Sequence, residues 1–358
     1  MRNDGKPIKG RGAMLQVPNR FEAITKGAFH AEGIDEPLGE TAPEPTRYLP
    51  VDARNIVNPV NSPDLPFRYS MNPYQGCEHG CAYCYARPTH EYWGYSAGLD
   101  FERVILVKRG AAARLEQTLR RPGWEVQPIS ISGATDPYQP IERKEGLTRS
   151  LLQVALDFGQ PVVIITKNAL VLRDLDLLSE MASKGLASVA ISLTTLDESL
   201  RRALEPRTST TAQRLEAIRA LSGAGVPVMA MLAPIIPALN EPEVSSLLKA
   251  GAAAGAISAS YTVLRTNGAV EPVFRAWLEA HYPDRSARVL AQTRAVHGGA
   301  VSDSRPGRRL RGEGPFAENI NRVFRVLRRR HFGERAMPTL RTDLFKPPPQ
   351  GQLGLFDG

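Results

Sequence analysis

Short apolar runs alternate with stretches of helical spacing through the middle of the chain. The apolar runs cover residues 104–107, 129–132, 162–166, 188–193, 226–232 and 257–264. The stretches with helical spacing cover residues 111–119, 146–158, 175–184, 212–221 and 244–254. Strands that alternate with helices of this length form β–α–β units and a parallel sheet. About six units are too few for a closed eight-fold barrel, so the pattern predicts an α/β fold with a partial (β/α)6 TIM-like barrel.

The two ends of the chain differ from this middle. The N-terminal end is rich in proline, glycine and charge, so we expect an extended leader that is partly ordered where apolar residues such as Phe21 and Ile24 dock. The C-terminal part has helical spacing over residues 272–280, 284–296 and 316–330, followed by a stiff triple proline. The sequence therefore predicts a leader at 1–65, the barrel at 66–272, a helical basic region at 273–342 and a flexible tail at 343–358.

Polar side chains follow several of the predicted strands. Because the carboxyl ends of parallel strands meet at one edge of the sheet, we expect these side chains to converge there. They are Gly133, Ala134, Thr135 and Asp136 after the second run, Thr166 and Lys167 after the third, and Ser192, Thr194 and Thr195 at the fourth.

Charge is unevenly distributed along the 358 residues. The net charge is +8, and residues 303–342, with eleven arginines and four acids, contribute +7 of it. A basic region on a nearly neutral body favours an anionic partner, with nucleic acid as the first candidate. The alternative is an arginine-rich helix that is merely solvated.

Nothing in the sequence predicts a membrane or secreted protein. No run of 18 apolar residues occurs, and residues 1–12 are basic without an apolar core. We therefore expect a cytoplasmic protein with no membrane contact, associated with the bacterial nucleoid if DNA is its substrate.

The three cysteines of the chain, Cys77, Cys81 and Cys84, lie within eight residues, beside Gly76 and Gly80. An odd and low count excludes a disulfide scaffold. Three thiolates can hold three irons of a [4Fe–4S] cluster and leave the fourth iron open to a substrate or cofactor. Two alternatives remain: a zinc site completed by one of the neighbouring histidines, His79 or His90, and three buried thiols without metal.

The spacing C-x3-C-x2-C, with Tyr83 just before the last cysteine, resembles the signature of the radical SAM superfamily. The resemblance covers about residues 65–272. It implies that S-adenosylmethionine chelates the open iron of a [4Fe–4S] cluster. A reductant such as flavodoxin or ferredoxin would then supply an electron, and a 5′-deoxyadenosyl radical would abstract hydrogen from the substrate.

Residues 130–136, 165–167 and 190–192 resemble the spore photoproduct lyase-like branch of that superfamily, which includes DNA repair enzymes. The resemblance implies that Thr135 and Asp136 face the amino group of S-adenosylmethionine. It also implies that Lys167 and Ser192 face the carboxylate, and that Tyr83 lies near the adenine. For Asp136 and Lys167 the alternative is an ordinary solvated pair at the strand ends.

One position departs from that branch. Gly133 stands where the spore lyase carries a cysteine that returns a hydrogen atom to the product. Either another residue closes the radical cycle, for which Tyr138 and Tyr261 are the candidates, or the substrate differs.

Three further segments have two interpretations each. Residues 90–95 are aromatic and either pack a loop or stack bases. Glu205 and Arg207 form either a polar clamp on the substrate or an ion pair at a helix end. The tail resembles the peptide that binds the bacterial sliding clamp, unless it docks on its own body, and the residues concerned are Gln352, Leu353, Leu355 and Phe356.

The combined features predict a radical enzyme that acts on DNA, as a lyase-type repair enzyme. A radical enzyme for RNA, a peptide or a small molecule is the first alternative. A non-catalytic, nucleic-acid-binding module that holds zinc or a cluster is the second.

Overall fold

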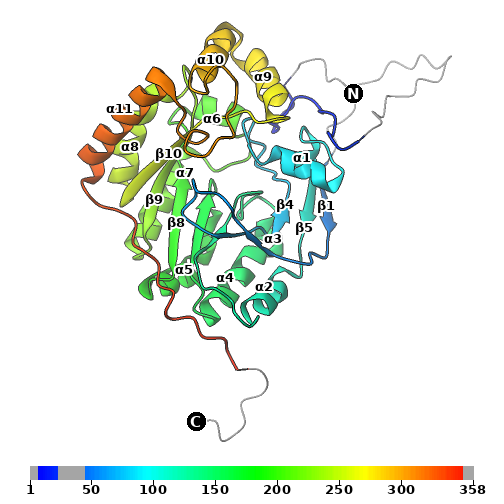
Figure 1. Ribbon diagram of the computed structural model, residues 1–358, viewed down its shortest axis with the longest axis vertical. Helices are drawn as coiled ribbons and strands as arrows, with labels where there is room; N and C mark the ends of the chain where they lie inside the picture. The colour runs from blue at the N-terminus through cyan, green and yellow to red at the C-terminus, as the bar shows by residue number, and fades with distance from the viewer. Residues whose placement is uncertain (1–6, 23–44, 350–358) are drawn as a thin grey trace, which may run out of the picture.

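A seven-stranded, mostly parallel sheet forms the centre of the computed structural model, which describes residues 7–22 and 45–349 (Figure 1). The strand order is β10-β9-β8-β7-β6-β3-β2. All neighbours pair in parallel except β2, which is antiparallel to β3. The strands are β2 (Val57–Pro59), β3 (Tyr69–Met71), β6 (Ile129–Ile131), β7 (Val162–Thr166), β8 (Ala187–Ser192), β9 (Val228–Ile235) and β10 (Ser258–Val263). The predicted parallel α/β sheet is confirmed.

One predicted strand lies elsewhere. The run at 104–107 forms β5 (Val104–Val107), but β5 belongs to a separate three-stranded sheet. There it pairs in parallel with β1 (Arg47–Pro50) and antiparallel with β4 (Tyr74–Gln75). The short strand β3, which the hydrophobic pattern does not reveal, takes the first parallel position in the main sheet instead.

Helices follow the strands as the spacing predicts and cover the sheet in Figure 1. The predicted ones are α2 (Ala111–Leu119), α4 (Leu147–Asp157), α5 (Leu175–Ser183), α7 (Thr211–Gly223) and α8 (Val244–Ala253). Three short helices were not predicted, because four to seven residues are too few to show a helical period. They are α1 (Asp100–Arg103), α3 (Glu142–Glu145) and α6 (Glu198–Leu204), joined by the 3-10 segments η1 (Arg87–Trp93), η2 (Ala169–Asp174) and η3 (Glu241–Glu243).

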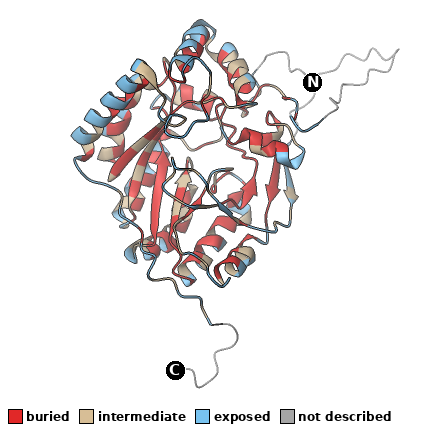
Figure 2. Cartoon of the chain, viewed as in Figure 1, coloured by how far each residue is buried: buried red, intermediate tan, exposed pale blue. Residues whose placement is uncertain are grey.

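The main core lies between the sheet and these helices, where Figure 2 shows the strands largely buried. All six residues of β8 are buried, as expected for a central parallel strand that is covered on both faces. No helix in the described residues is long and apolar enough to cross a membrane.

The C-terminal helices are part of this body. They are α9 (Val270–His281), α10 (Pro283–Ala295) and α11 (Gly314–Phe332). α11 packs against α8 and β10, and it contributes Ile320, Phe324 and Phe332 to the main core. The arginine-rich segment is therefore not an appendage on the body. Beyond it the chain stays docked, since the N–H of Arg341 donates to Gly185 O (2.9 Å) and that of Lys346 to Phe158 O (3.0 Å).

The predicted leader is also integrated into the fold. Residues 45–65 supply β1 and β2, one strand to each sheet. Residues 7–22 lie along the cysteine-bearing end of the body without regular structure. Phe21 does not dock as expected, because it is 57% exposed; its ring lies 5.0 Å from that of Tyr92, with Arg20 beside it. Ile24 lies outside the described residues.

Candidate functional site

The cysteine loop, residues 76–84, connects β4 to the segment before η1. Cys77 and Cys81 are buried and Cys84 is partly buried. The loop is tied down at both ends, since Cys77 N–H donates to Phe101 O (2.8 Å) and Ala82 N–H to Leu204 O (3.0 Å). Gly76 has φ +78, and a Cβ there would lie 2.7 Å from the carbonyl oxygen of β5's first residue, so only glycine fits this turn.

The end of β6 contacts this loop directly. The Thr135 hydroxyl donates to Gly76 O (2.7 Å) and accepts from the Gln139 amide (2.8 Å). The Gln139 carbonyl in turn accepts the backbone N–H of Glu78 (2.9 Å). Thr135 therefore holds the cysteine loop, which the strand-end argument did not specify.

Asp136 is occupied by neighbours from the protein. Its carboxylate accepts the Thr166 hydroxyl (2.7 Å) and the Lys167 N–H (2.8 Å), and it lies 3.4 Å from Nδ1 of His79. Burial alone would raise the pKa of Asp136, but His79 and these donors hold it below its usual range. The Asn168 carbonyl accepts Leu170 N–H (3.0 Å), which turns its amide N–H toward His79 Nε2 (3.2 Å). Burial alone would lower the pKa of His79, but the charges of Asp136 and Cys77 raise it to about 10.

Glu205 lies at the centre of a second network beside the loop. It is fully buried, and it accepts the Tyr83 phenol, the Thr194 hydroxyl (2.6 Å) and a guanidinium N–H of Arg214. Lys167 Nζ lies 3.4 Å from Glu205 and 5.6 Å from the centre of the Tyr83 ring. Burial alone would raise the pKa of Glu205, but Arg214 and Lys167 hold it well below its usual range. The structure thus brings Tyr83 and Lys167 together.

Other predicted residues have separate partners. The Ser192 carbonyl accepts an N–H of Arg214 (3.1 Å). Arg207 does not pair with Glu205; its guanidinium lies 3.5 Å from Glu78 and donates to Gly10 O (3.0 Å). Sequence reasoning missed Arg214, which lies within α7 and has no local signal that separates it from a surface arginine.

The two tyrosines proposed for hydrogen return are buried in the body. The Tyr138 phenol donates to Asp174 (3.1 Å), at the start of α5. Tyr261 packs against Phe324 of α11 and lies under the guanidinium of Arg311, 4.0 Å from its ring centre.

An exposed tyrosine that the sequence reasoning overlooked borders the cysteine loop. Tyr85 directly follows Cys84 and is half exposed. Its ring lies 5.2 Å from the guanidinium of Arg265, in the segment that follows β10. A half-exposed tyrosine, whose phenol has a pKa raised by burial to about 12, thus stands next to the last thiol. The only signal in the sequence was adjacency to Cys84.

Residues 90–95 include some side chains that pack the loop and others that are exposed and free to stack on bases. His90 and Glu91 are buried, and His90 stacks on Tyr95 (5.2 Å between ring centres). Tyr92 and Trp93 are exposed, Tyr92 by 71%. The tail residues with the clamp-like pattern, Gln352, Leu353, Leu355 and Phe356, lie outside the described residues.

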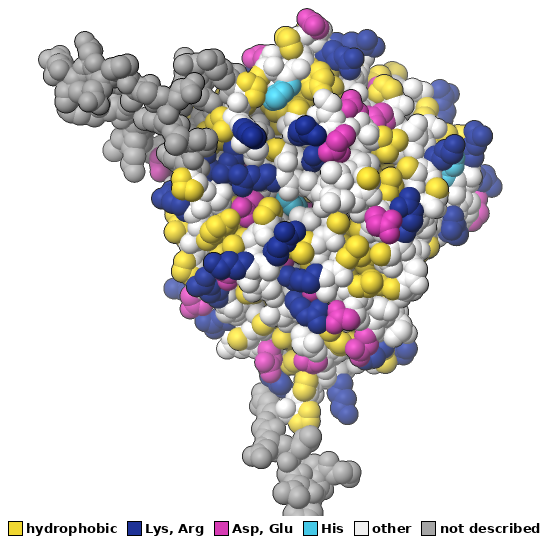
Figure 3. Space-filling view, turned by 180° about the vertical axis from the view of Figure 1, so that it is seen from behind, with side chains coloured by type: hydrophobic (Ala, Val, Ile, Leu, Met, Phe, Trp, Pro, Cys, Tyr) yellow, Lys and Arg dark blue, Asp and Glu magenta, His cyan; other side chains and the backbone are white. Residues whose placement is uncertain are grey.

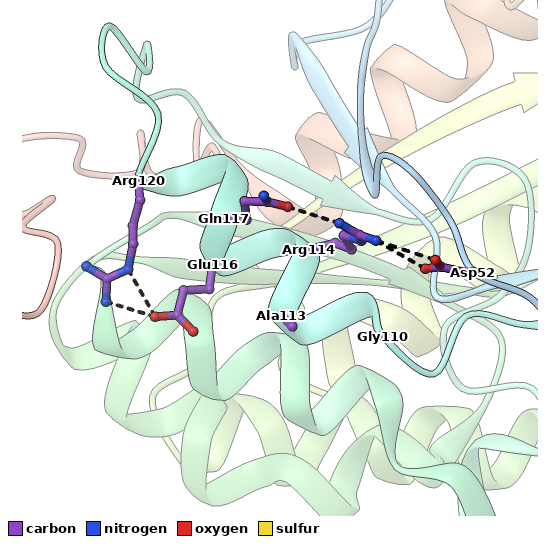
Figure 4. A pocket seen from close by; sticks show the side chains of 7 residues that line it. All are labelled: Asp52, Gly110, Ala113, Arg114, Glu116, Gln117 and Arg120. Atoms are coloured by element: carbon purple, nitrogen blue, oxygen red, sulfur yellow. Dashed lines mark hydrogen bonds and ion pairs between the residues drawn. The ribbon is translucent and has the colours of Figure 1, made fainter. Parts of the chain in front are cut away.

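A surface hollow over α2 is unrelated to these networks. Figure 4 shows its side chains engaged with one another: Arg114 reaches Asp52 (3.4 Å) and Arg120 reaches Glu116 (2.8 Å). No strand-end or cysteine-loop residue lines it. It therefore has no place in the chemistry of the site.

The cysteine loop fits a cluster bound by three thiolates. All three thiols lie on one tight loop, where Cys77 and Cys81 are buried and Cys84 is partly buried. Among the described residues, no three His, Cys, Asp or Glu side chains are grouped so that they could hold one metal ion. That finding does not bear on a cluster, whose thiolates bind separate irons.

Comparisons with known proteins show the family of the chain. Residues 71–250 match the family model of the Radical SAM superfamily. An uncharacterised protein of Mycobacterium tuberculosis is 39% identical over 238 residues, which cover 66% of this chain and 70% of that protein. An uncharacterised protein of Methanocaldococcus jannaschii is 29% identical over 195 residues, 54% of this chain and 70% of that one.

Solved structures of spore photoproduct lyase share the fold. One, complexed with dinucleoside spore photoproduct, superimposes with a TM-score of 0.57 at 19% identity, over 80% of both chains. Another holds S-adenosylmethionine as well and gives the same score. Because the family model matches half of the chain and includes the cysteine loop, the chain belongs to the radical SAM superfamily.

Proposed function

We propose that this radical SAM enzyme acts on DNA, as a lyase-type repair enzyme. The superfamily uses a [4Fe–4S] cluster and S-adenosylmethionine. The cysteine loop is therefore assigned to an iron–sulfur cluster and not to zinc. When bound, this pair supplies a 5′-deoxyadenosyl radical that abstracts hydrogen from the substrate. Cys77, Cys81 and Cys84 would hold the cluster at its three protein-bound irons.

The residues around the loop suit the binding of S-adenosylmethionine. Lys167 has a cationic ammonium beside the Tyr83 ring, so Lys167 and Ser192 would face the carboxylate and Tyr83 the adenine. Thr135 and Asp136 would line the amino-group side, although protein donors already bind the Asp136 carboxylate. In this role Asp136 would bind donors of the pocket itself, such as the Lys167 N–H. Backbone carbonyl oxygens would then make the direct contacts to the amino group of S-adenosylmethionine.

The arginine surface of α11 is the observation that supports DNA most directly. The helix contains five arginines and one acid. Arg322, Arg325 and Arg330 are exposed along its outer side, so their charges face solvent. Figure 3 shows Lys and Arg side chains gathered at the edge of the molecule where α11 lies. Rows of arginine bind phosphates without reading bases.

Several finer features belong to the same proposal. The parallel strands lie side by side in the order in which they follow one another along the chain, from β3 through β6, β7, β8 and β9 to β10. This order is typical of a partial barrel, within the predicted region 66–272. A flavodoxin or ferredoxin would supply the electron. Location at the bacterial nucleoid and contact with the sliding clamp through the tail remain predictions.

Hydrogen return needs a residue in place of the cysteine that Gly133 replaces. Tyr138 and Tyr261 stay candidates, but the Tyr138 phenol is bound to Asp174 and the Tyr261 ring is packed inside the helix layer. Tyr85 is better placed for this role, because the residue is half exposed and directly follows Cys84. A half-exposed residue can meet a substrate without a rearrangement of the core.

An anaerobic assay of the reconstituted protein tests the proposal. We expect 5′-deoxyadenosine on reduction, with a higher yield when ultraviolet-irradiated DNA is added than with undamaged DNA. Altered dinucleotides should appear in the digested DNA by mass spectrometry. Stimulation by RNA or peptides and not by DNA would support the alternative radical enzyme.

A further inference from the structure

Residues 7–22, here called the N-terminal strap, cross the outside of the cysteine loop. A Cβ at Gly12 would lie 1.8 Å from Gly80 O and 2.9 Å from Ala82 N. Gly12 is therefore in backbone contact with the two residues on either side of Cys81. No positive φ occurs at Gly12, so the close approach alone requires glycine there.

One buried carboxylate joins the strap to the body. Glu102, at 0% exposure, accepts the N–H of Gly12 (3.1 Å) and the N–H of Ala13 (2.7 Å). Its own carbonyl accepts the guanidinium of Arg11 (2.6 Å). Both backbone N–H groups donate to the same carboxylate, and such charge-assisted hydrogen bonds are stronger than neutral ones.

The same carboxylate is tied to a cluster ligand. Glu102 pairs with Arg87, which is also fully buried. Arg87 donates two N–H groups to the carbonyl of Cys81, at 2.8 and 3.2 Å. A continuous chain of polar contacts therefore runs from the strap through Glu102 and Arg87 to the backbone of Cys81.

Additional contacts fix the rest of the strap along its length. Val17 exchanges hydrogen bonds with the Ser96 hydroxyl (3.0 and 2.7 Å). The Gln16 amide donates to Asp100 (2.6 Å) and that of Asn19 to Glu91 O (2.9 Å). The strap has no helix or strand of its own, and it is held by these bonds, by the Glu102 bonds and by the packing of Ala13 and Val17 in a small apolar cluster.

We propose that the N-terminal strap is a wall of the cluster site and that Gly12 and Glu102 are positioning residues, which fix the Cys81 segment and limit access of solvent to the cluster. The region that matches the family model begins at residue 71, so the strap is an addition outside that region. Its predicted effect is on retention of iron by the loaded protein, which involves neither DNA nor the radical reaction.

Gly12→Ala tests the proposal in the full-length, anaerobically reconstituted protein. The added methyl group collides with Gly80 O, so the strap must move away from the loop. We expect a ferrous-iron chelator to strip the variant about tenfold faster than the wild type, because local opening controls access. Hydrogen exchange of the strap peptide should accelerate in parallel. Gly223→Ala is the matched control, because a Cβ at Gly223 meets no atom within 4 Å.

A second variant covers the case in which Gly12→Ala fails to fold. Gln16→Ala combined with Asn19→Ala removes two strap contacts that do not touch the cysteine loop. It should accelerate iron release by a smaller factor, in step with the loss of exchange protection. A variant whose strap has lost its protection from hydrogen exchange, but which releases iron at the wild-type rate, would overturn the proposal. A strap without exchange protection in the wild type would overturn it as well. Because no DNA is used, these outcomes are distinct from a failure of the proposed function.

Discussion

Replacement of Glu205 by glutamine should strongly destabilise the fold. Glu205 is fully buried and pairs with the equally buried Arg214. Loss of one partner leaves a buried charge without its counterion, which costs about 3–5 kcal/mol. Arg214 keeps the carbonyls of Ser192 (3.1 Å) and Ser209 (3.0 Å) as acceptors. We therefore expect the lower end of that range, about 3 kcal/mol in the free energy of unfolding.

Urea denaturation under anaerobic conditions, followed by circular dichroism, measures this loss. Glu216→Gln is the control, since Glu216 and Arg219 form an exposed pair at 2.7 Å and its loss should cost less than about 1 kcal/mol. Glu205→Gln combined with Arg214→Met should be more stable than the sum of the two single variants implies, because the buried guanidinium is removed together with its carboxylate partner. If Glu205→Gln lowers the free energy of unfolding by no more than the control does, the buried Glu205–Arg214 pair does not stabilise the fold as expected.

Four further predictions concern chemistry, pH, binding and hydrogen return. Cys84→Ala should abolish the brown cluster and 5′-deoxyadenosine formation, and normal turnover would refute the ligand assignment. Burial lowers the pKa of Lys108 to about 8. Between pH 8 and 10 only the unfolded chain keeps that proton, so the free energy of unfolding should rise by up to about 3 kcal/mol over this range. Lys108→Met should flatten this rise in denaturation curves. Arg322→Glu with Arg325→Glu should weaken DNA binding and reduce its salt dependence in fluorescence titrations, and an unchanged slope would exclude α11 as a phosphate surface. Tyr85→Phe should lower the yield of altered DNA while the cluster's absorbance stays unchanged, and full yield would remove Tyr85 from the radical cycle.

The parallel sheet and its longer helices could be predicted because their signals are local. Helices α2, α4 and α5 each present one apolar face, and each central strand is a short apolar run, whereas α7 has the buried Arg214 among its inward-facing residues. The position of β5 could not be predicted, because its four apolar residues suit either sheet equally. Its partner β1 lies in a segment whose proline and charge content predicts an extended chain.

The candidate site was predictable only in part for a similar reason. The cysteines and the strand-end polar residues are marked by their spacing and by their place after apolar runs. Arg214 and Glu102 act through partners distant in sequence: Glu102 binds the strap, about ninety residues away. Gly12 is recognisable only from the backbone that it touches. Such long-range contacts leave no periodic trace in a single sequence.

The docking of the last described residues determines where anything attached beyond them must begin. Arg341 binds the turn before β8 and Lys346 the turn before β7, so the chain leaves the body at the amino ends of the strands. The cysteine loop and the strand-end residues stand at the opposite, carboxyl edge. A protein attached beyond residue 349 would thus start from the edge opposite the cysteine loop, and it could be held there while the cysteine loop stays uncovered.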